Sequence, residues 1–512
     1  MKKTVIGFLL LWVTVIVSAQ YANTLYFLEN SPYRHTINPA FMPISKVYFG
    51  MSPMAYMNAS IRSTIALSDV LQKKDGKIVT ALYNDKTRQK FLRNLRLSGK
   101  RFSGDVNMNL NILSFGFRVK DKNYFHLNIS EHFEAVGFLP YDIFRLAMDD
   151  GMDDFTGTNR FDLSRLGFKG NIYTELAIGY SRIINEQWTV GGKFKLLSGQ
   201  LYMGVQVSSL DLKTSYQRWT LDGRGDLMLS GPFKESSLPA FVDRADDDAF
   251  QPADDLRAFF KPYGVGVAVD MGAVYRPFEL LKTSFAITDL GFISWKRMAR
   301  RYDCKLQATY IGLQGKIDMQ AIWNTLGDLH KNMLSSTIAD DRFTRMIRAK
   351  LNVGADLMLV NDKIDIGLYS KTDFFGKYVS EEITLGAALR PANWFHFALT
   401  YSFVGANWNC LGTGLTLMPK DGIQFMLACD YIPLKYATID NKQKVPYKLS
   451  NIDLSLGFAL VFGSYKKEKK EEAPPILQTE ETTETKHRKV KNDNENPHLS
   501  QKDRNWKKKK NW

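Results

Sequence analysis

Cysteine is nearly absent from this 512-residue sequence, which contains only three. Three thiols are too few for the disulfide framework of a small exported domain. Catalytic signatures are missing too: none of the seven histidines falls in a His-Glu-x-x-His pattern, and the chain has neither a Gly-x-Ser-x-Gly elbow nor a phosphate-binding Gly-Lys-Ser/Thr loop. The members of a catalytic triad need not be close in sequence. No pattern here supports an enzyme, however, and we expect no catalytic residues and no cofactor.

Long apolar runs are scarce as well. The one near the start, residues 5–17, follows Lys2 and Lys3 and ends in the small residues of 17–19. This arrangement predicts a secretory signal peptide over residues 1–19. No later stretch reaches the ~18 apolar residues that a spanning helix needs, so we expect no membrane helix. The formal net charge of +15 would suit nucleic acid, but export argues against a nucleic-acid partner.

What the sequence does contain is alternation, most clearly in residues 451–462. One face of this stretch carries Ile452, Leu454, Leu456, Phe458, Leu460 and Phe462, and the other carries small or polar residues. Because side chains of a strand alternate between its two faces, the pattern predicts a strand between apolar and polar surroundings. A strand of a soluble sandwich would look similar. Here, however, the run ends on an aromatic, and the charged segment 463–512 that follows is expected to be a disordered periplasmic tail.

Such an ending resembles the closing strand of bacterial outer-membrane barrels, which the barrel-assembly machinery reads. Alternation recurs through residues 46–462, which we thread as fourteen antiparallel strands. They are predicted at 46–65, 104–118, 123–136, 166–184, 187–208, 261–277, 281–314, 347–360, 363–375, 379–391, 394–405, 409–419, 422–432 and 449–462. All short turns then fall on one side and all long connections on the other, as in outer-membrane barrels.

The predicted fold class is therefore all-β: a transmembrane antiparallel β-barrel of about fourteen strands. Within its long connections, the helical spacing of Tyr141–Met148 and Ala321–Leu334 predicts short helices packed on the barrel mouth. The residues near 212–231 and those after 300 would break the parity of the threading if they crossed the membrane. We interpret them as strand extensions or a hairpin in the outer loops.

The segment from 20 to 45 combines loop-like prolines with core-like apolar side chains. It contains Tyr26, Phe27, Asn38, Pro39 and Phe41. Residues that must be hidden from water but cannot form a regular element predict a plug inside a wide barrel. A frayed exported terminus is the alternative.

Several short motifs stand out along the chain. They are Asn23–Phe27, Ile37–Phe41, Tyr173–Glu175 with Gly179–Ser181, Asp289–Ile293 with Trp295, and Lys350–Ala355. These motifs are similar to those of a family of Bacteroidota outer-membrane proteins whose shared domain has no assigned function. That family resembles the FadL-type long-chain fatty-acid channels, which are monomeric fourteen-stranded barrels with an N-terminal hatch. The resemblance implies this fold and a monomer, and it supports only a hypothesis about cargo.

Alternation also predicts which charged side chains point into the lumen. They are Glu175, Lys193, Lys195, Asp270, Lys350, Asp356, Asp365, Glu382, Arg390 and Asp453. A Lys or Arg on the lipid face at mid-depth costs about 2–4 kcal/mol, whereas a lumen can hydrate or pair it. The mixed signs favour a cross-linked, narrow or plugged interior over an open pore. These charges either line a passage or only hold the barrel together.

One predicted strand breaks its own alternation. The parity of Phe285 and Ile287 would place Asp289 in lipid, and Gly291 follows two residues later. A bulge there would turn Asp289 inward and interrupt the wall. By resemblance to FadL-type channels, Asp289 and Gly291 are candidates for a lateral gate; a purely structural bulge is the alternative.

Two connections, 149–154 and 243–255, are rich in Asp. Neither has the ligand spacing and closing Glu of an EF-hand, so we expect solvated loops and no metal site.

Three functions remain open for a protein of the cell outer membrane that contacts its lipid. The first is passage or capture of a hydrophobic or amphipathic small molecule. The second is a secretion or surface-assembly accessory, and the third is a structural or adhesive barrel. An apolar pocket beside the plug would favour the first, an exposed apolar patch on loops 209–260 the second, and a sealed interior the third.

Overall fold

The computed structural model describes residues 23–464 except 66–70, 75–76, 81–84, 98–100, 149–158, 216–217, 234–260, 312–341, 361–362, 377, 393, 405–406, 421, 433–435, 440–442 and 447–450. The predictions for the signal peptide, the two acidic loops, the helix at 321–334 and the tail beyond Ser464 lie outside the described residues. The chain divides into two units, Met1–Tyr465 and Lys466–Trp512, and only the first contains described residues.

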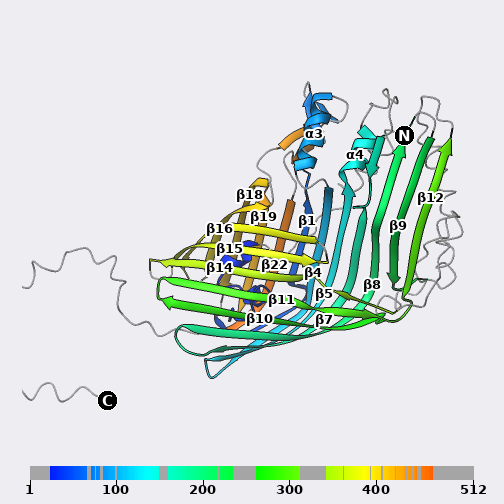
Figure 1. The fold of residues 1–512 in the computed structure, drawn as a ribbon. Helices are drawn as coiled ribbons and strands as arrows, with labels where there is room; N and C mark the ends of the chain where they lie inside the picture. Colours follow the sequence, from blue (N-terminus) through cyan, green and yellow to red (C-terminus); the bar gives the residue numbers. More distant parts are fainter. Residues whose placement is uncertain are drawn as a thin grey trace, which may run out of the picture. The chain divides into compact units, whose positions relative to one another are not determined.

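Fourteen antiparallel strands form the wall of a closed barrel (Figure 1). They are β1 (Ser45–Ser63), β4 (Arg101–Val119), β5 (Asn123–Pro140), β7 (Gly167–Ile183), β8 (Trp188–Thr214), β10 (Gly264–Phe278), β11 (Leu281–Trp295), β14 (Ala349–Leu359), β15 (Ile364–Phe375), β16 (Tyr378–Ala392), β17 (Phe395–Val404), β18 (Asn407–Lys420), β19 (Ile423–Ile432) and β22 (Asn451–Ser464). The barrel is closed because β1 pairs with β22 on one side and with β4 on the other. The predicted fold class and strand number are confirmed.

One predicted strand is wrong in its extent. The segment predicted as 281–314 ends as β11 at Trp295, and the chain continues as β12 (Arg300–Ile311). Strand β12 pairs with β9 (Arg218–Ser230), which in turn pairs with the outer part of β8. These two strands extend the sheet beyond β8 at the end of the barrel opposite the short turns (Figure 1).

The remaining described elements are short. They are the 3-10 helices η1 (Asn23–Phe27) and η2 (Pro32–Thr36), the helices α3 (Asp85–Leu97) and α4 (Tyr141–Met148), and the strands β2 (Leu71–Lys74), β3 (Lys77–Thr80), β6 (Asn159–Asp162), β13 (Phe343–Met346), β20 (Tyr436–Ile439) and β21 (Gln443–Pro446). Helix α4 has the bounds predicted from its spacing, whereas α3 was not predicted. Among the described residues, no helix has the length and apolar character needed to cross a membrane.

The wall strands have an apolar outer face and a polar inner face. On β7, Leu176, Ile178 and Tyr180 are 38%, 61% and 40% exposed, while the alternate residues Glu175 and Ala177 are buried. An aromatic girdle marks the end with the short turns. Its ring pairs are Phe117 with Phe125, Phe125 with Tyr180, and Trp188 with Tyr275. An apolar band with such a girdle is the surface that a membrane-spanning barrel presents to lipid.

Candidate functional site

The plug segment, residues 20–45, lies inside the barrel from Asn23 onward. Tyr26, Phe27 and Phe41 are at most 6% exposed, and the Tyr26 ring stacks on the ring of Tyr369 from β15 with centroids 4.5 Å apart. The 3-10 helix η1 carries Tyr26 and Phe27, and η2 follows it before Phe41, although the sequence predicted no regular element here. The apolar residues of this segment therefore form the core of the barrel rather than a solvated terminus.

Asn38 and Pro39 anchor the end of the plug segment to the wall. The Asn38 side chain donates to the carbonyls of Ala273 and Phe285 at 3.3 and 3.2 Å, and its oxygen accepts from the Ala40 N–H at 2.8 Å. The Ser181 hydroxyl donates to the Pro39 carbonyl. Backbone groups that would be left unpaired in a buried loop thus find partners in the strands.

Charged wall residues hold the middle of the plug. The Glu29 carboxylate accepts from Lys282 and Arg390, and the Tyr26 hydroxyl donates to Asp356 at 2.8 Å. Burial alone would raise the pKa of the Glu29 carboxyl, but the two cations outweigh burial and hold it well below its ordinary value. Each cation also has a second carboxylate partner, since Lys282 pairs with Asp356 at 3.0 Å and Arg390 pairs with Asp365.

The plug also forms a hydrogen bond to the wall beside the seam where β1 meets β22. The register of β1 against β22 shifts between Phe49 and Tyr56, so a stretch of β1 bulges away from its partner. The Tyr33 hydroxyl of the plug donates to the carbonyl of Phe458 in β22 at this level. A plug side chain therefore satisfies a wall carbonyl beside the bulge.

Above the plug, charged side chains cross the lumen in what we call the charged layer. Its members are Arg62, Asp105, Glu175, Lys193, Lys195, Asp270, Asp289, Arg348, Lys350, Lys371, Asp373 and Glu382. Arg348 makes a two-pronged bond to Asp105, at 2.7 Å for each prong, although 243 residues separate them. Arg62 joins Asp373 at 2.7 Å and Glu382. These pairs tie opposite walls of the barrel together.

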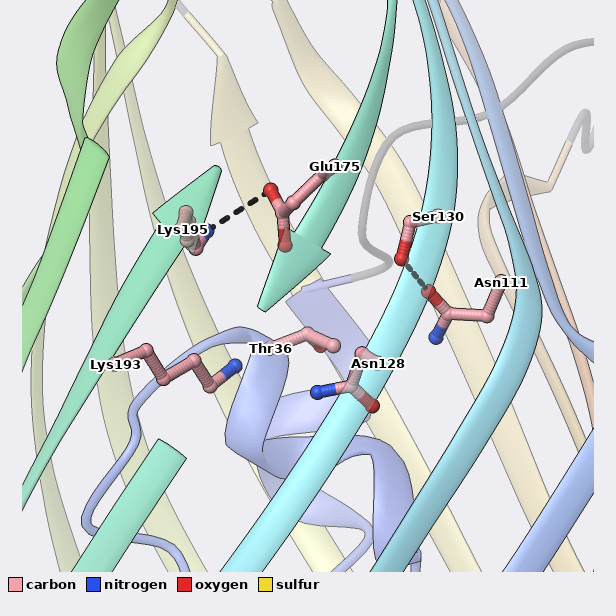
Figure 2. A pocket seen from close by; sticks show the side chains of 7 residues that line it. All are labelled: Thr36, Asn111, Asn128, Ser130, Glu175, Lys193 and Lys195. Carbon is pink, nitrogen blue, oxygen red and sulfur yellow. Dashed lines mark hydrogen bonds and ion pairs between the residues drawn. The ribbon is translucent and has the colours of Figure 1, made fainter. Parts of the chain in front are cut away.

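A small cavity of about 10 Å³, room for about one water molecule, lies in the charged layer beside the plug. Its lining is entirely polar: Thr36, Asn111, Asn128, Ser130, Glu175, Lys193 and Lys195. Figure 2 shows Thr36 of the plug and Asn128 of β5 on the same side of this space, and the ion pair between Lys195 and Glu175. Ligand pockets usually measure about 300–1,000 Å³ and are mostly apolar. This pocket suits water or a small polar group, not a hydrophobic cargo.

The wall is interrupted at the level of the charged layer, where the broken alternation predicted a bulge. Asp289 has a φ of 60°, and the register of β11 against β10 shifts between Val269 and Met271. The extra residue keeps Asp289 on the inner face, 2% exposed. There its carboxylate pairs with Lys350 at 2.7 Å and with Lys195.

The other edge of β11 loses its ladder at the same place. Pairing with β14 ends at Thr288 and Lys350, and pairing with β13 begins at Phe292 and Met346. Across the gap, the Ile347 N–H donates to the Gly291 carbonyl at 3.2 Å. We call this stretch, 289–291 facing 347–349, the wall interruption.

A buried apolar cluster adjoins the inner side of the wall interruption, toward the outer end of the barrel. We call this cluster the apolar compartment. It comprises Tyr173, Leu197, Tyr202, Met228, Tyr263, Ala268, Ile293, Trp295, Ala299, Phe343 and Ile347. Trp295 can lie flat against the wall because Gly199 and Gly264 present no side chain beneath its ring. The sequence analysis missed this compartment, although Trp295 belongs to one of the motifs it singled out.

The lumen residues predicted by alternation all lie on the inner face. Glu175, Lys193, Lys195, Asp270 and Lys350 meet in the charged layer, while Asp356, Asp365 and Arg390 surround the plug near the short turns. The Glu382 carboxylate accepts a hydrogen bond from the side-chain amide of Asn23 in the plug at 2.8 Å. Asp453 lies directly opposite Asp430 in the β19–β22 ladder. Among the described residues, no group of His, Cys, Asp and Glu has the arrangement of a metal site.

His35 connects the plug to the charged layer. Its Nδ1 lies 3.0 Å from the Lys193 ammonium, its Nε2 lies 2.9 Å from the Tyr48 hydroxyl, and its ring stacks on His126. An ammonium can only donate, so Nδ1 accepts and the ring is neutral. Burial, with the nearby Lys193 charge, lowers the pKa of His35 well below its ordinary value.

Acid is therefore expected to loosen the plug. A released plug binds the proton on His35 more readily than the docked one, so docking is strongest above about pH 6.5 and weakens below it. One titrating group can weaken the free energy of plug docking by at most about 1.4 kcal/mol per pH unit, which is a tenfold change in the docking equilibrium. In planar bilayers, the open fraction of the barrel should therefore rise by up to tenfold for each pH unit below about 6.5. The lowered pKa of Glu29 adds a second loss only at more acidic pH, because its contribution is complete above the ordinary carboxyl value.

The matched variant for this titration is His35→Gln, which keeps a polar side chain and removes the titrating ring. Its open fraction should stay flat across the window just below pH 6.5. The same pH profile in the parent and in His35→Gln would show that His35 does not control docking.

The closed wall, the apolar outer band and the internal plug define a plugged transmembrane β-barrel. The chain belongs to a family of unknown function, DUF5723, whose model matches residues 39–430. Among curated proteins, none matches the sequence.

Several solved structures match the chain at low similarity. The Ralstonia pickettii toluene transporter TbuX has 8% identity and a TM-score of 0.41, with 87% of this chain and 99% of that chain covered. A Pseudomonas aeruginosa FadL homologue has 12% identity and a TM-score of 0.37 over 87% of this chain and 99% of its own. The CymD monoaromatic hydrocarbon channel has 11% identity and a TM-score of 0.38 over 88% of this chain and 96% of its own. Likeness at this level carries no information about cargo.

Proposed function

We propose that this protein is a monomeric outer-membrane barrel that captures a hydrophobic or amphipathic small molecule at its outer end and releases it sideways into the membrane. The observation that carries the proposal is the contact between the apolar compartment and the wall interruption. Ile347 belongs to both the compartment and the interruption, and Ile293 of the compartment lies two residues beyond Gly291. An apolar molecule that replaced the side-chain packing there would already be beside the lipid.

The route straight through the lumen is unfavourable for such a molecule. Below the apolar compartment, it would have to cross the charged layer and then displace the plug. Each buried ion pair that the molecule separated would leave a charge without its partner, at a cost of several kcal/mol, roughly 3–5. A sideways exit above the charged layer avoids this cost. Asp289 and Gly291, which lie in the wall interruption, would then form the lateral gate.

Location in the outer membrane and a Bacteroidota origin remain parts of the proposal. Support for the location comes from the predicted signal peptide, the apolar band and the aromatic girdle, because a barrel with these features is built for a bilayer reached after export. The apolar closing strand β22 supports assembly by the barrel machinery. The proposed activity is transport or capture, not catalysis.

Capture in the apolar compartment is tested by the fluorescence of Trp295, which is 1% exposed. A brominated long-chain fatty acid added to the detergent-purified barrel should produce a saturable quenching component that disappears entirely in Trp295→Phe. The matched control is Trp188→Phe, which removes a 41% exposed girdle tryptophan and should keep the component. If Trp295→Phe is quenched like the parent, the fatty acid binds only at the apolar band on the outer face of the barrel, and the compartment is not a capture site.

A structural barrel is the second candidate, and the dense bonding between plug and wall supports it. Glu29, Asn38 and Tyr33 each bond to a different part of the wall. Among the described residues, the pocket beside the plug is polar. The secretion-accessory alternative depends on loops 209–260, of which 234–260 lie outside the described residues.

A further inference from the structure

Helix α3 carries a cationic face that the proposed function does not use. Lys90, Arg93 and Arg96 are exposed, and none of them has an acidic partner within the described part of the chain. The opposite face of the helix is buried through Phe91 and Leu95, which are 3% and 2% exposed. The sequence therefore turns all three of these cations toward the solvent side.

The spacing of these cations destabilises the helix when no anionic group lies against them. Lys90 and Arg93 are three residues apart, as are Arg93 and Arg96, so each neighbouring pair shares one side of the helix. Like charges at this spacing destabilise a helix. An anionic surface against this face would turn the repulsion into attraction.

The packing of α3 places it on the outer side of the wall. Phe91 contacts Phe144 of α4 edge-on with ring centroids 5.6 Å apart, and Phe144 contacts Phe102 at the start of β4. Phe102 points outward, because the next residue, Ser103, is buried on the inner face and side chains alternate. The two helices lie at the end of the barrel opposite the short turns (Figure 1).

This position adjoins the headgroup region of the outer leaflet. On β4 and β5 the exposed apolar positions nearest to α3 are Ile112 and Phe133, which are 37% and 38% exposed, and Phe133 faces Met108 in the ladder. The helix pair, packed at Phe102, therefore lies beyond the exposed apolar band of these strands. Basic side chains at a headgroup surface attract anionic lipid, and their charge-assisted bonds to phosphate oxygens are strong.

We propose that the exposed face of α3 binds the phosphorylated glycolipid headgroups of the outer leaflet through Lys90, Arg93 and Arg96. This inference rests on the outer-membrane location in the proposed function. The bound lipid would hold the helix pair against the wall beside β4 and β5. It would also fix the orientation of the outer connections in the leaflet.

The test is the affinity of the purified full-length barrel in detergent for lipid A, followed by native mass spectrometry. The K90E/R93E/R96E variant should bind at least about 100-fold more weakly, because each of the three basic groups near an anionic surface contributes about fivefold and the new carboxylates add repulsion. The matched control K46E/K122E/K363E makes the same charge change at exposed positions near the short-turn end and should bind like the parent. Dephosphorylated lipid A should bind weakly to all three proteins.

Two results would overturn the proposal: parent-like affinity of K90E/R93E/R96E for lipid A, or equal affinity of the parent for lipid A and its dephosphorylated form. If the charge-reversed helix fails to fold, judged by heat-modifiable migration, K90Q/R93Q/R96Q replaces it and should bind about 100-fold more weakly, because it removes the same three basic groups. Parent-like binding by that variant would also refute the site. Trp295 quenching does not involve α3, so failure of capture and failure of lipid binding are distinguishable.

Discussion

Deletion of residues 20–42 is expected to raise the ionic conductance of the barrel in planar bilayers at least about tenfold. The wall does not need the plug for closure, since β1 pairs with β22 and β4 through its own backbone. Water entering the emptied lumen would hydrate Lys282, Arg390 and the other side chains that lose plug partners, which limits the cost of their exposure. The variant should therefore assemble, but leak.

The matched control is deletion of residues 466–512, which removes the whole second unit and leaves the plug intact. That variant should conduct as little as the parent. Equal, low conductance of the plug deletion and the parent, with both proteins showing heat-modifiable folding, would show that the segment does not seal the lumen.

The second large effect is expected at Gly291. A Cβ there would collide with the side chain of Ala268 and the carbonyl of Val267 on β10. Gly291→Val should push β11 from its neighbour and disturb the bond that Gly291 accepts from Ile347. Overpacking of this kind costs about 1–3 kcal/mol. We expect uptake of a fluorescent long-chain fatty acid to fall at least about tenfold in cells that depend on this barrel.

The control for an added side chain on the wall is Gly104→Val, because the nearest atoms to a Cβ at Gly104 belong to the Phe102 ring at 3.8 and 3.9 Å. This variant should take up the probe like the parent. Parent-like uptake by folded Gly291→Val would remove the reason to treat the wall interruption as a gate.

The strands were predictable because their signal is local. Alternation of β7 and β22 is written in consecutive residues, and lipid on one side with a polar lumen on the other makes that alternation strict. The bulge at Asp289 was predictable for the same reason, since a carboxylate at an outward position contradicts the pattern. The extent of β11 was harder to predict. Alternation continues past Trp295 into β12, and nothing local in the sequence shows that β12 leaves the barrel wall to pair with β9.

The contacts across the barrel could not be predicted. Periodicity places Asp105 on the inner face but cannot select Arg348 as its partner, because that choice depends on the curvature of the whole wall. The apolar compartment is equally non-local, since it gathers residues such as Tyr173 and Trp295 from separate strands. Helix α3 was missed because its buried face has few apolar residues, Phe91 and Leu95 among them, within a charge-rich segment.

A reversible clamp across the wall interruption tests sideways release most directly. Phe292 and Met346 are direct partners of β11 and β13, and neighbouring strands hold such pairs about 4.5–5.5 Å apart, within reach of a disulfide. In a background whose three native cysteines are serine, Phe292→Cys with Met346→Cys should block uptake of the fluorescent fatty acid when oxidised and restore it when reduced. The control pair is Phe285→Cys with Val353→Cys, partners below the interruption, which should transport in both redox states. Undiminished uptake by the oxidised clamp at 292 and 346 would contradict lateral release through this part of the wall.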